Sequence, residues 1–302
     1  MLNRRRKLFL LKFFSLFSVV RGYNILFLII AIYLTSIYIL APNLSIREVL
    51  TDINLLVLVM ASASAIASGY IINNFYDSEK DLINRPRKTI LDRLVSQRTK
   101  LTTYFVLNLL SVILASYVSF KAVIFFSIYI FFLWFYSHKL KKYPFIGNLT
   151  AAILTVVPFF VVFVYYGNFD LVIFVHAIFL FMIISMRELI KDLENLRGDF
   201  TLNYHTIPVL YGEQTSKKML TILGILTFIP ALILVTHFSQ DVGRMIYYFY
   251  GSMVALIVFL ILLWTAKKKI NYVILHTILR FILVIGVLSI GLIRVESIVT
   301  HL

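Results

Sequence analysis

The sequence contains no cysteine and few acidic residues. Its 302 residues include 14 Asp and Glu side chains against 29 Lys and Arg. Without cysteine the chain has no disulfide bond, thiolate metal site or cysteine nucleophile. With so few acids, any cluster of carboxylates stands out. The formal net charge of +15 does not indicate nucleic acid as a partner, because the basic residues lie in short segments between apolar runs, as in proteins seated on an anionic membrane surface.

Apolar residues dominate the chain. They make up 61% of the sequence, and the mean hydropathy is +0.92, whereas ordinary soluble domains are nearer half apolar. The apolar runs are close to the ~20 residues that a helical membrane span needs, and they lack the alternation of barrel strands. We therefore expect an all-α membrane protein, residues 1–302 forming a single polytopic domain, with nine transmembrane helices between 22 and 293, at about 22–40, 54–76, 101–119, 122–138, 147–166, 171–190, 219–237, 245–265 and 272–293.

The first twenty residues have a separate pattern. Four basic residues at 4–7 precede an apolar run at 8–20, an order typical of signal peptides. However, Lys12 interrupts this run and no small-residue cleavage site follows it. The pattern therefore predicts an amphipathic segment over residues 1–20 that lies in the membrane interface and is retained.

The distribution of basic residues predicts the orientation of the spans. Alternate connections, beginning with the N-terminal one, hold 24 of the 29 Lys and Arg residues, the opposite connections hold four, and Arg280 lies inside the last span. By the positive-inside rule the rich side is cytoplasmic. We expect a protein of the cell (inner) membrane with its N-terminus in the cytoplasm and its C-terminus outside.

Two clusters of acids and amides follow the second and sixth expected spans, on the same predicted side. The first consists of Asn73, Asp77 and Asp81, and the second of Asp192, Asn195 and Asp199. On a helix, residues three to four positions apart share a face. Hard oxygen ligands are what Mg²⁺ prefers, and it usually takes one or two carboxylates together with phosphate oxygens and water. These six residues are the predicted metal ligands, acting through a Mg²⁺-diphosphate.

Basic residues surround both clusters and complete the predicted site. A single Asp at a helix end is usually a cap or a solvated group, but two clusters of matching type on one side of a membrane are harder to explain in that way, because charged groups there are costly to desolvate. The combination predicts a site for a lipid diphosphate that opens to the cytoplasmic side. The candidate diphosphate-binding residues are Arg85, Lys88, Lys139, Lys141 and Lys191.

These motifs resemble those of the UbiA superfamily of intramembrane prenyltransferases, and the resemblance extends along essentially the whole chain. The first motif, Asn73–Asp81, is similar to the family's Asn-Asp-x-x-Asp-x-x-x-Asp, with Asn74 in place of the first Asp. The second, Lys191–Asp199, is similar to Lys-Asp-x-x-Asp-x-x-Gly-Asp, with Asn195 where Asp is common. The resemblance implies a UbiA-type helical bundle, related to the isoprenoid-synthase arrangement, and a Mg²⁺-dependent transfer of a polyprenyl group from an allylic polyprenyl diphosphate donor to a lipophilic acceptor.

Within the superfamily, the chain is most similar to the digeranylgeranylglyceryl phosphate synthase branch. Residues 81–86 and the Thr206-Ile207-Pro208 run resemble that branch, whereas residues 88–93 depart from its Arg-Pro-Ile-Pro-Ser-Gly. The branch implies a glycerol-phosphate-type lipid acceptor similar to geranylgeranylglyceryl phosphate, and an aromatic acceptor in quinone, haem or related biosynthesis stays open. For a prenyl cation, the candidate shielding residues are Tyr70, Tyr76 and Tyr136.

A membrane transporter is the alternative from another class. Transporters normally carry their polar groups near mid-membrane, on helices interrupted by Gly or Pro. Here the acidic residues lie at the ends of the expected spans, which favours the enzyme. The predicted partners are the donor, the acceptor and membrane lipids, and the sequence makes no prediction of oligomeric state.

The absence of cysteine provides a direct test of the predicted topology. A single cysteine at Ser78 should react with a membrane-impermeant thiol reagent only in inside-out vesicles, because Ser78 lies beside the first cluster. A cysteine at Asn168 should react only in right-side-out cells. Labelling of both positions from the same side would contradict the orientation that the basic residues predict.

Overall fold

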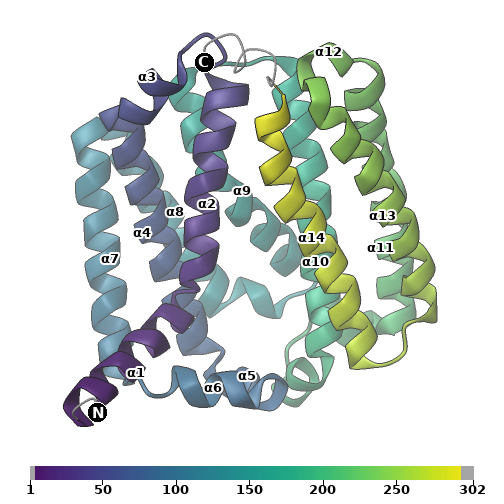
Figure 1. The fold of residues 1–302 in the computed structure, drawn as a ribbon. Coiled ribbons are helices and arrows are strands. Elements are labelled where there is room, and N and C mark those ends of the chain that lie inside the picture. Colours follow the sequence, from purple (N-terminus) through teal and green to yellow (C-terminus); the bar gives the residue numbers. More distant parts are fainter. Residues whose placement is uncertain (1–3, 294–302) are drawn as a thin grey trace. The chain divides into compact units, whose positions relative to one another are not determined.

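The computed structural model describes residues 4–293, and all regular elements in this range are helices. Nine of the described helices are long and apolar enough to cross a membrane, which confirms the predicted spans (Figure 1). They are Gly22–Leu40, Ile53–Tyr76, Gln97–Val118, Phe120–Lys142, Ile146–Tyr166, Leu171–Thr201, Ile207–Thr236, Ser239–Thr265 and Lys269–Leu292.

The chain forms two compact units, which we describe in turn. The first comprises Met1–Ile30, Thr51–Lys141 and Arg197–Asn203. It contains α1 (Arg4–Val19), the start of α2 (Gly22–Thr35), α4 (Ile53–Tyr76), α5 (Ser78–Asn84), α6 (Pro86–Asp92), α7 (Gln97–Val118), α8 (Phe120–His138), the start of η2 (Leu140–Lys142) and the last turn of α10 (Leu171–Thr201).

Small side chains allow α4 to pack closely in the first unit. The middle of α4 is an Ala- and Ser-rich run, residues 61–68, most of which is buried. Small residues let helix backbones approach each other in a membrane protein. Accordingly α4 packs against both α7 and α8, and Figure 1 shows α4 and α7 running side by side. The Ser111 hydroxyl of α7 donates to the carbonyl of Ala61 at 2.9 Å, so α4 is the central helix of this unit.

The second unit comprises Ala31–Leu50, Lys142–Leu196 and Tyr204–Leu302, of which the structure describes residues up to 293. Its core is built by α10, α11, α13 and α14, and it includes the fully buried residues Met186, Leu220, Leu256 and Leu279. Its elements are η1 (Ser36–Leu40), α3 (Ile46–Thr51), α9 (Ile146–Tyr166), most of α10, α11 (Ile207–Thr236), α12 (Ser239–Val242), η3 (Gly243–Met245), α13 (Ile246–Thr265), α14 (Lys269–Ser289) and η4 (Ile290–Leu292).

Two helices are longer than their apolar runs predict. The α10 helix continues beyond residue 190 to Thr201, so the whole second motif is helical. The α11 helix begins at Ile207 rather than near 219, with Pro208 in its first turn, where the missing N–H of proline is not needed. A kink at Gly212 (φ 81°, ψ 168°) separates this first turn from the rest of α11. The hydropathy of the sequence identified only the apolar part of α10 and of α11.

The spacing of the first motif predicted that its three residues share one face of a single helix. In the structure the motif is divided between two helices. The α4 helix ends at Tyr76, Asp77 has φ −90° and ψ 3°, and α5 begins at Ser78. The α-helical pattern, in which each N–H donates to the carbonyl four residues earlier, nevertheless continues across the break. The Asp77 N–H donates to the Asn73 carbonyl at 2.9 Å, and the Asp81 N–H donates to the Asp77 carbonyl at 2.8 Å. The three residues therefore stay on successive turns, although the helix changes direction between them.

The sequence predicted an interfacial segment at the N-terminus and an outside location for the C-terminus. Residues 4–19 form α1, which is not among the nine apolar helices, and its position in the membrane interface stays a prediction. The predicted outside location of the C-terminus concerns residues 294–302, which lie outside the described residues.

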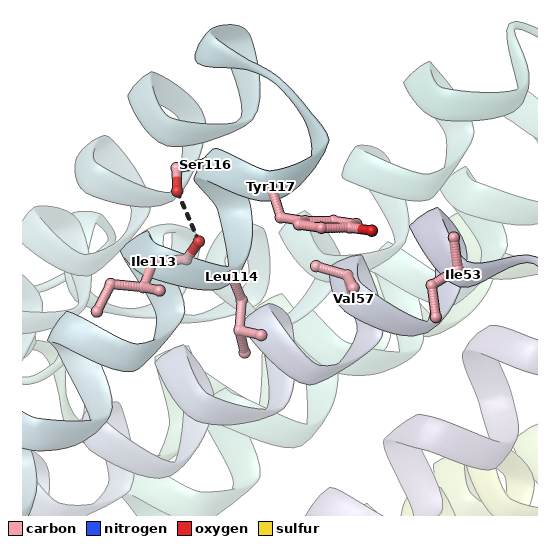
Figure 2. A pocket seen from close by; sticks show the side chains of 6 residues that line it. All are labelled: Ile53, Val57, Ile113, Leu114, Ser116 and Tyr117. Atoms are coloured by element: carbon pink, nitrogen blue, oxygen red, sulfur yellow. Dashed lines mark hydrogen bonds between the residues drawn. The ribbon is translucent and has the colours of Figure 1, made fainter.

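An apolar crevice lies on the first unit between α4 and α7. It has a volume of about 390 Å³, and Ile53, Val57, Ile113, Leu114, Ser116 and Tyr117 line it (Figure 2). The only hydrogen bond drawn there joins the Ser116 hydroxyl to the Ile113 carbonyl of the same helix, at 2.7 Å. At 1.5 Å per helical residue, Val57 is roughly 25 Å from Asn73. The crevice is therefore separate from the first motif.

Candidate active site

A buried ion pair forms the centre of the site in the first unit. The Asp77 carboxylate accepts a hydrogen bond from Lys141 Nζ at 2.7 Å, and the same ammonium donates to Asn73 Oδ1 at 3.2 Å. Asp77 is 6% exposed and Lys141 is 8% exposed. A charge-assisted hydrogen bond of this kind is needed to keep both charges away from water. A predicted metal ligand and a predicted diphosphate-binding cation therefore meet at the end of α4.

Lys80 connects this pair to the second motif. Its Nζ lies 3.3 Å from Asp199 Oδ1 and 3.6 Å from Asp77 Oδ1. Asp199 is 1% exposed, and it belongs to the first unit because the last turn of α10 does. One carboxylate from each motif thus shares a single ammonium. The prediction grouped these two acids, but it did not include the lysine between them.

The backbone of the second motif also meets the end of α5. The Asn84 side chain accepts a hydrogen bond from the Gly198 N–H at 3.2 Å, and Asn84 is buried. A Cβ atom at position 198 would overlap the Asn84 side-chain amide. Glycine at this position therefore permits the close approach that places Asp199 beside Lys80.

Asp81, the third acid of the first motif, lies in a less favourable environment for a charge. Burial raises the pKa of its carboxyl, and the neighbouring Asp77 carboxylate raises it further, while Lys80, Arg85 and Arg21 oppose both effects. A carboxylate that is already poorly solvated gains more from an approaching cation. The electrostatics of Asp81 are therefore those expected of a metal ligand.

The predicted basic residues are distributed unevenly. Burial lowers the pKa of Lys88, as does the Arg21 guanidinium, while Asp92 and Asp81 raise it, so Lys88 is within electrostatic reach of the first motif. Arg85 is also close to the first motif, since its charge lowers the pKa of Asp81. Lys139, by contrast, is exposed. Of the cations that follow α8, Lys141 is the one that the structure brings to the acids.

The remaining predicted ligands belong to the second unit. Asp192 Oδ2 accepts a hydrogen bond from Asn148 Nδ2 of α9 at 2.7 Å, and Asn195 is 7% exposed. Lys191, predicted to bind the diphosphate, has its Nζ 2.6 Å from Glu188 Oε2, which makes a close ion pair on α10. Asn148 is another residue that the sequence reasoning missed, since it follows a loop with no acidic neighbour.

A second buried pair joins α10 to α14. Glu194 Oε2 is 2.8 Å from His276 Nδ1 of α14, and both residues are buried. Glu194 was not among the predicted metal ligands, because on a helix it points away from Asp192. Its carboxylate is engaged by α14 inside the second unit.

The three candidate aromatic residues differ in their surroundings. The Tyr76 ring lies 5.9 Å from Lys141 Nζ and 5.3 Å from the His138 ring, so it is beside the buried ion pair. The Tyr70 ring lies 4.9 Å from the Arg21 guanidinium, and its hydroxyl accepts a hydrogen bond from Asn24 at 3.3 Å. Tyr136 is half-buried. Tyr76 is the aromatic residue with direct access to the charged centre.

The chemistry of these side chains fits Mg²⁺ when it is bound together with a diphosphate. All predicted donors are carboxylate or amide oxygens, as Mg²⁺ requires. Among the described residues, no three His, Asp or Glu side chains come close enough to hold a metal ion by themselves. Mg²⁺ does not need such a cage, because phosphate oxygens and water complete its coordination. The arrangement therefore favours a metal ion shared between protein and ligand.

Sequence comparisons match the chain to a family of prenyltransferases. Residues 25–282 match the model of the UbiA prenyltransferase family. The chain is 34% identical over 168 residues to a digeranylgeranylglyceryl phosphate synthase of Methanosphaera stadtmanae, an alignment that covers 55% of this chain and 60% of that protein. It is 31% identical over 167 residues to the synthase of Pyrococcus furiosus, with the same coverage. The chain thus spans about 60% of the length of these curated relatives.

Solved structures with a similar fold cover almost the whole chain. A structure of digeranylgeranylglyceryl phosphate synthase is similar with a TM-score of 0.68 at 23% identity, over 94% of this chain and 99% of that one. A UbiA homolog from Archaeoglobus fulgidus bound to GPP and Mg²⁺ is similar with a TM-score of 0.65 at 14% identity, over 92% of this chain and 99% of that one.

The close approach at Gly198 leads to a first prediction for the site. A Gly198→Ala substitution should displace Asn84 and move Asp199 away from Lys80, because the added methyl group overlaps the Asn84 amide. We expect Mg²⁺-diphosphate to bind about tenfold more weakly, as for the loss of a buried charge-assisted contact, measured by calorimetry on the purified protein. As a control, Gly251→Ala adds a methyl group where no atom lies within 4 Å, and binding should not change. Equal binding by both variants would contradict the importance of this contact.

The environment of Asp81 leads to a second prediction. A raised pKa in the folded state means that ionised Asp81 destabilises the fold, so this penalty appears as the pH rises through the pKa of the carboxyl in the folded protein. Asp81→Asn should therefore raise the melting temperature at pH 7 in a metal-free buffer, while weakening Mg²⁺-diphosphate binding. At a pH well below 4, where the carboxyl is protonated in both states, the two proteins should melt alike. A lower melting temperature for Asp81→Asn at pH 7 would contradict the inferred penalty.

Proposed function

Since the chain belongs to the UbiA prenyltransferase family, we propose that it transfers a polyprenyl group from an allylic polyprenyl diphosphate to a lipophilic acceptor. One observation carries this proposal. The side chains of Lys141, Asp77, Lys80 and Asp199 form a continuous series of charges, with Lys141–Asp77 at 2.7 Å, Lys80–Asp77 at 3.6 Å and Lys80–Asp199 at 3.3 Å. All but the partly exposed Lys80 are buried. Alternating carboxylates and ammonium groups are what a protein needs to bind a metal ion and a diphosphate side by side.

Mg²⁺, when bound with the donor, supplies charge that stabilises the departing diphosphate. Asn73, Asp77, Asp81 and Asp199 are the residues of the first unit that would hold it. The roles of Asp192 and Asn195 as ligands stay predictions from the sequence. The UbiA homolog from Archaeoglobus fulgidus that is bound to GPP and Mg²⁺ supports the choice of metal.

The side chains of the protein would act on the leaving group. Lys80 and Lys141 are held by Asp77, so their ammonium groups are oriented in advance and need little reorganisation as negative charge develops on the diphosphate. The bond between the diphosphate oxygen and the allylic carbon breaks, and that oxygen keeps the electron pair. The acceptor oxygen then forms a bond to the carbon, and its proton passes to an oxygen of the released diphosphate. Tyr76, beside Lys141, would shield the allylic cation with its ring.

The preferred acceptor is a glycerol-phosphate-type lipid similar to geranylgeranylglyceryl phosphate. The names of the relatives from Methanosphaera stadtmanae and Pyrococcus furiosus support it. An aromatic acceptor is the second candidate, since residues 88–93 differ from the pattern of that branch. The proposed setting is a multi-pass protein of the cell membrane whose site opens to the cytoplasmic face, where the water-soluble diphosphate product would leave.

A reconstituted assay would test this function. The purified protein in liposomes should consume labelled polyprenyl diphosphates only with Mg²⁺ present, and should transfer the label to glycerophosphate lipids in preference to aromatic acceptors. Transfer to aromatic compounds alone would reverse the acceptor assignment. Flux of a solute without turnover of any donor would instead indicate a transporter.

The charge series also predicts the effect of a single substitution. Asp77→Asn should lower kcat about a hundredfold, because it removes the negative charge between the ammonium groups of Lys141 and Lys80, while leaving membrane insertion intact. The matched control is Asp170→Asn, which makes the same chemical change at an exposed position and should retain full activity. Similar rates for the two variants would mean that Asp77 has no part in the reaction.

A further inference from the structure

Asn74 lies inside the first motif, but its side chain has different partners from those of Asn73 and Asp77. Its Nδ2 donates to Asp92 Oδ2 at 3.1 Å, and its Oδ1 accepts from Lys100 Nζ at 2.8 Å. The neutral amide therefore connects a carboxylate on α6 to an ammonium on α7.

The two charged residues around Asn74 are buried, and the cluster has a fourth member. Asp92 Oδ1 accepts from the Ser18 hydroxyl of α1 at 2.9 Å. Asp92 is 3% exposed and Lys100 is 1% exposed. Ser18, Asn74, Asp92 and Lys100 thus join α1, α4, α6 and α7 inside the first unit, and we call them the Asn74 cluster.

The hydrogen-bonding pattern explains why position 74 carries an amide. An amide donates to a carboxylate and accepts from an ammonium at the same time, whereas an ionised Asp only accepts. An Asp at position 74 would place a second carboxylate directly against Asp92 in a buried setting, where like charges are costly. Asn74, which departs from the family motif, is thus in contact with Asp92, which lies in the 88–93 run that departs from the pattern of the branch. The acid missing from position 74 is present at position 92.

This contact fixes a segment that matters for the proposed reaction. Residues 77–92 leave the end of α4 at Asp77 and return to it through the bond between Asp92 and Asn74. Arg85 and Lys88 lie between these two attachment points. The basic segment is therefore held at both ends against the helix that carries Asn73 and Asp77.

We propose that the Asn74 cluster positions this basic segment for the diphosphate of the donor, with Asn74 and Asp92 acting as an exchanged amide–carboxylate pair. This inference rests on the proposed function. It makes Asn74, Asp92 and Lys100 positioning residues, which act through Arg85 and Lys88 and do not themselves bind the metal or the substrate.

Exchanging the two side chains separates this role from a general loss of stability. In Asn74→Asp two carboxylates face each other, and in Asp92→Asn the Lys100 charge loses its counter-charge. In the double variant the new carboxylate at position 74 would accept from Lys100 and from the new amide at position 92, whose oxygen would accept from Ser18. The double variant therefore keeps the net charge and the number of hydrogen bonds of the natural cluster.

The experiment measures the binding of Mg²⁺-diphosphate and the steady-state kinetics of the full chain in liposomes. Each single variant should raise the Kd for Mg²⁺-diphosphate and the KM for the donor about tenfold, as expected when a buried charge-assisted hydrogen bond is lost, with the KM for the acceptor unchanged. The double variant should return to within about threefold of the wild type, since its bonds are equivalent. The control is Ser111→Ala, which removes the buried hydrogen bond from α7 to the Ala61 carbonyl of α4 (2.9 Å) without altering any charge or any contact of residues 77–92, and should leave both constants unchanged.

The outcomes distinguish this inference from the proposed function. Diphosphate binding by the wild type without turnover of any donor would contradict the proposed function, while the binding constants of the variants would still test the cluster. Single variants that bind like the wild type, or a double variant no better than the weaker single, would overturn the inference. It would also be overturned if the wild type did not bind Mg²⁺-diphosphate, or if the acceptor KM rose in parallel with the donor KM.

Discussion

The cost of removing a carboxylate from water is the constraint on which the first unit depends. Asp77 and Asp199 are almost entirely buried, and an isolated buried charge is costly unless a partner and hydrogen bonds compensate it. Lys141 and Lys80 provide that compensation at 2.7 Å and 3.3 Å. Because each lysine needs its carboxylate as much as the reverse, the end of α4, the start of α5 and the last turn of α10 are held in one arrangement.

The same constraint explains local features that are otherwise unrelated. Asp199 reaches Lys80 because α10 continues past its apolar run, and because Gly198 leaves room for the Asn84 side chain. In the second unit, Glu188 is paired with Lys191 and Glu194 with His276. Asp77 and these three buried acids each lie close to a basic side chain, which is how a chain with 14 acids and 29 basic residues stabilises them.

Chemistry that begins with ionisation of a diphosphate suits such a site. Groups that are already oriented by ion pairs can stabilise a departing anion without rearranging, and the low exposure of Asp77, Lys141 and Asp199 keeps water away from this centre. The Asn74 cluster extends this principle beyond the acids themselves, since it fixes the course of the segment that carries Arg85 and Lys88.

The sequence by itself determined the nine spans, the two acidic clusters and their family, because continuous apolar runs and the spacing of acids are local properties of the chain. It also predicted that Asp77, Lys141 and Asp199 belong to the site. Only the tertiary structure revealed Lys80 as the partner of Asp77 and Asp199. It also revealed Asn84 as the partner of Gly198 and Asn148 as the partner of Asp192, and it separated Lys141 from the exposed Lys139. Apart from the i, i+3 pair of Asp77 and Lys80, these ion pairs and close approaches join residues far apart in the chain, so no local pattern encodes them. For the same reason the sequence shows Asn74 only as a departure from the family's Asp, whereas in the folded protein Asn74 is the partner of Asp92.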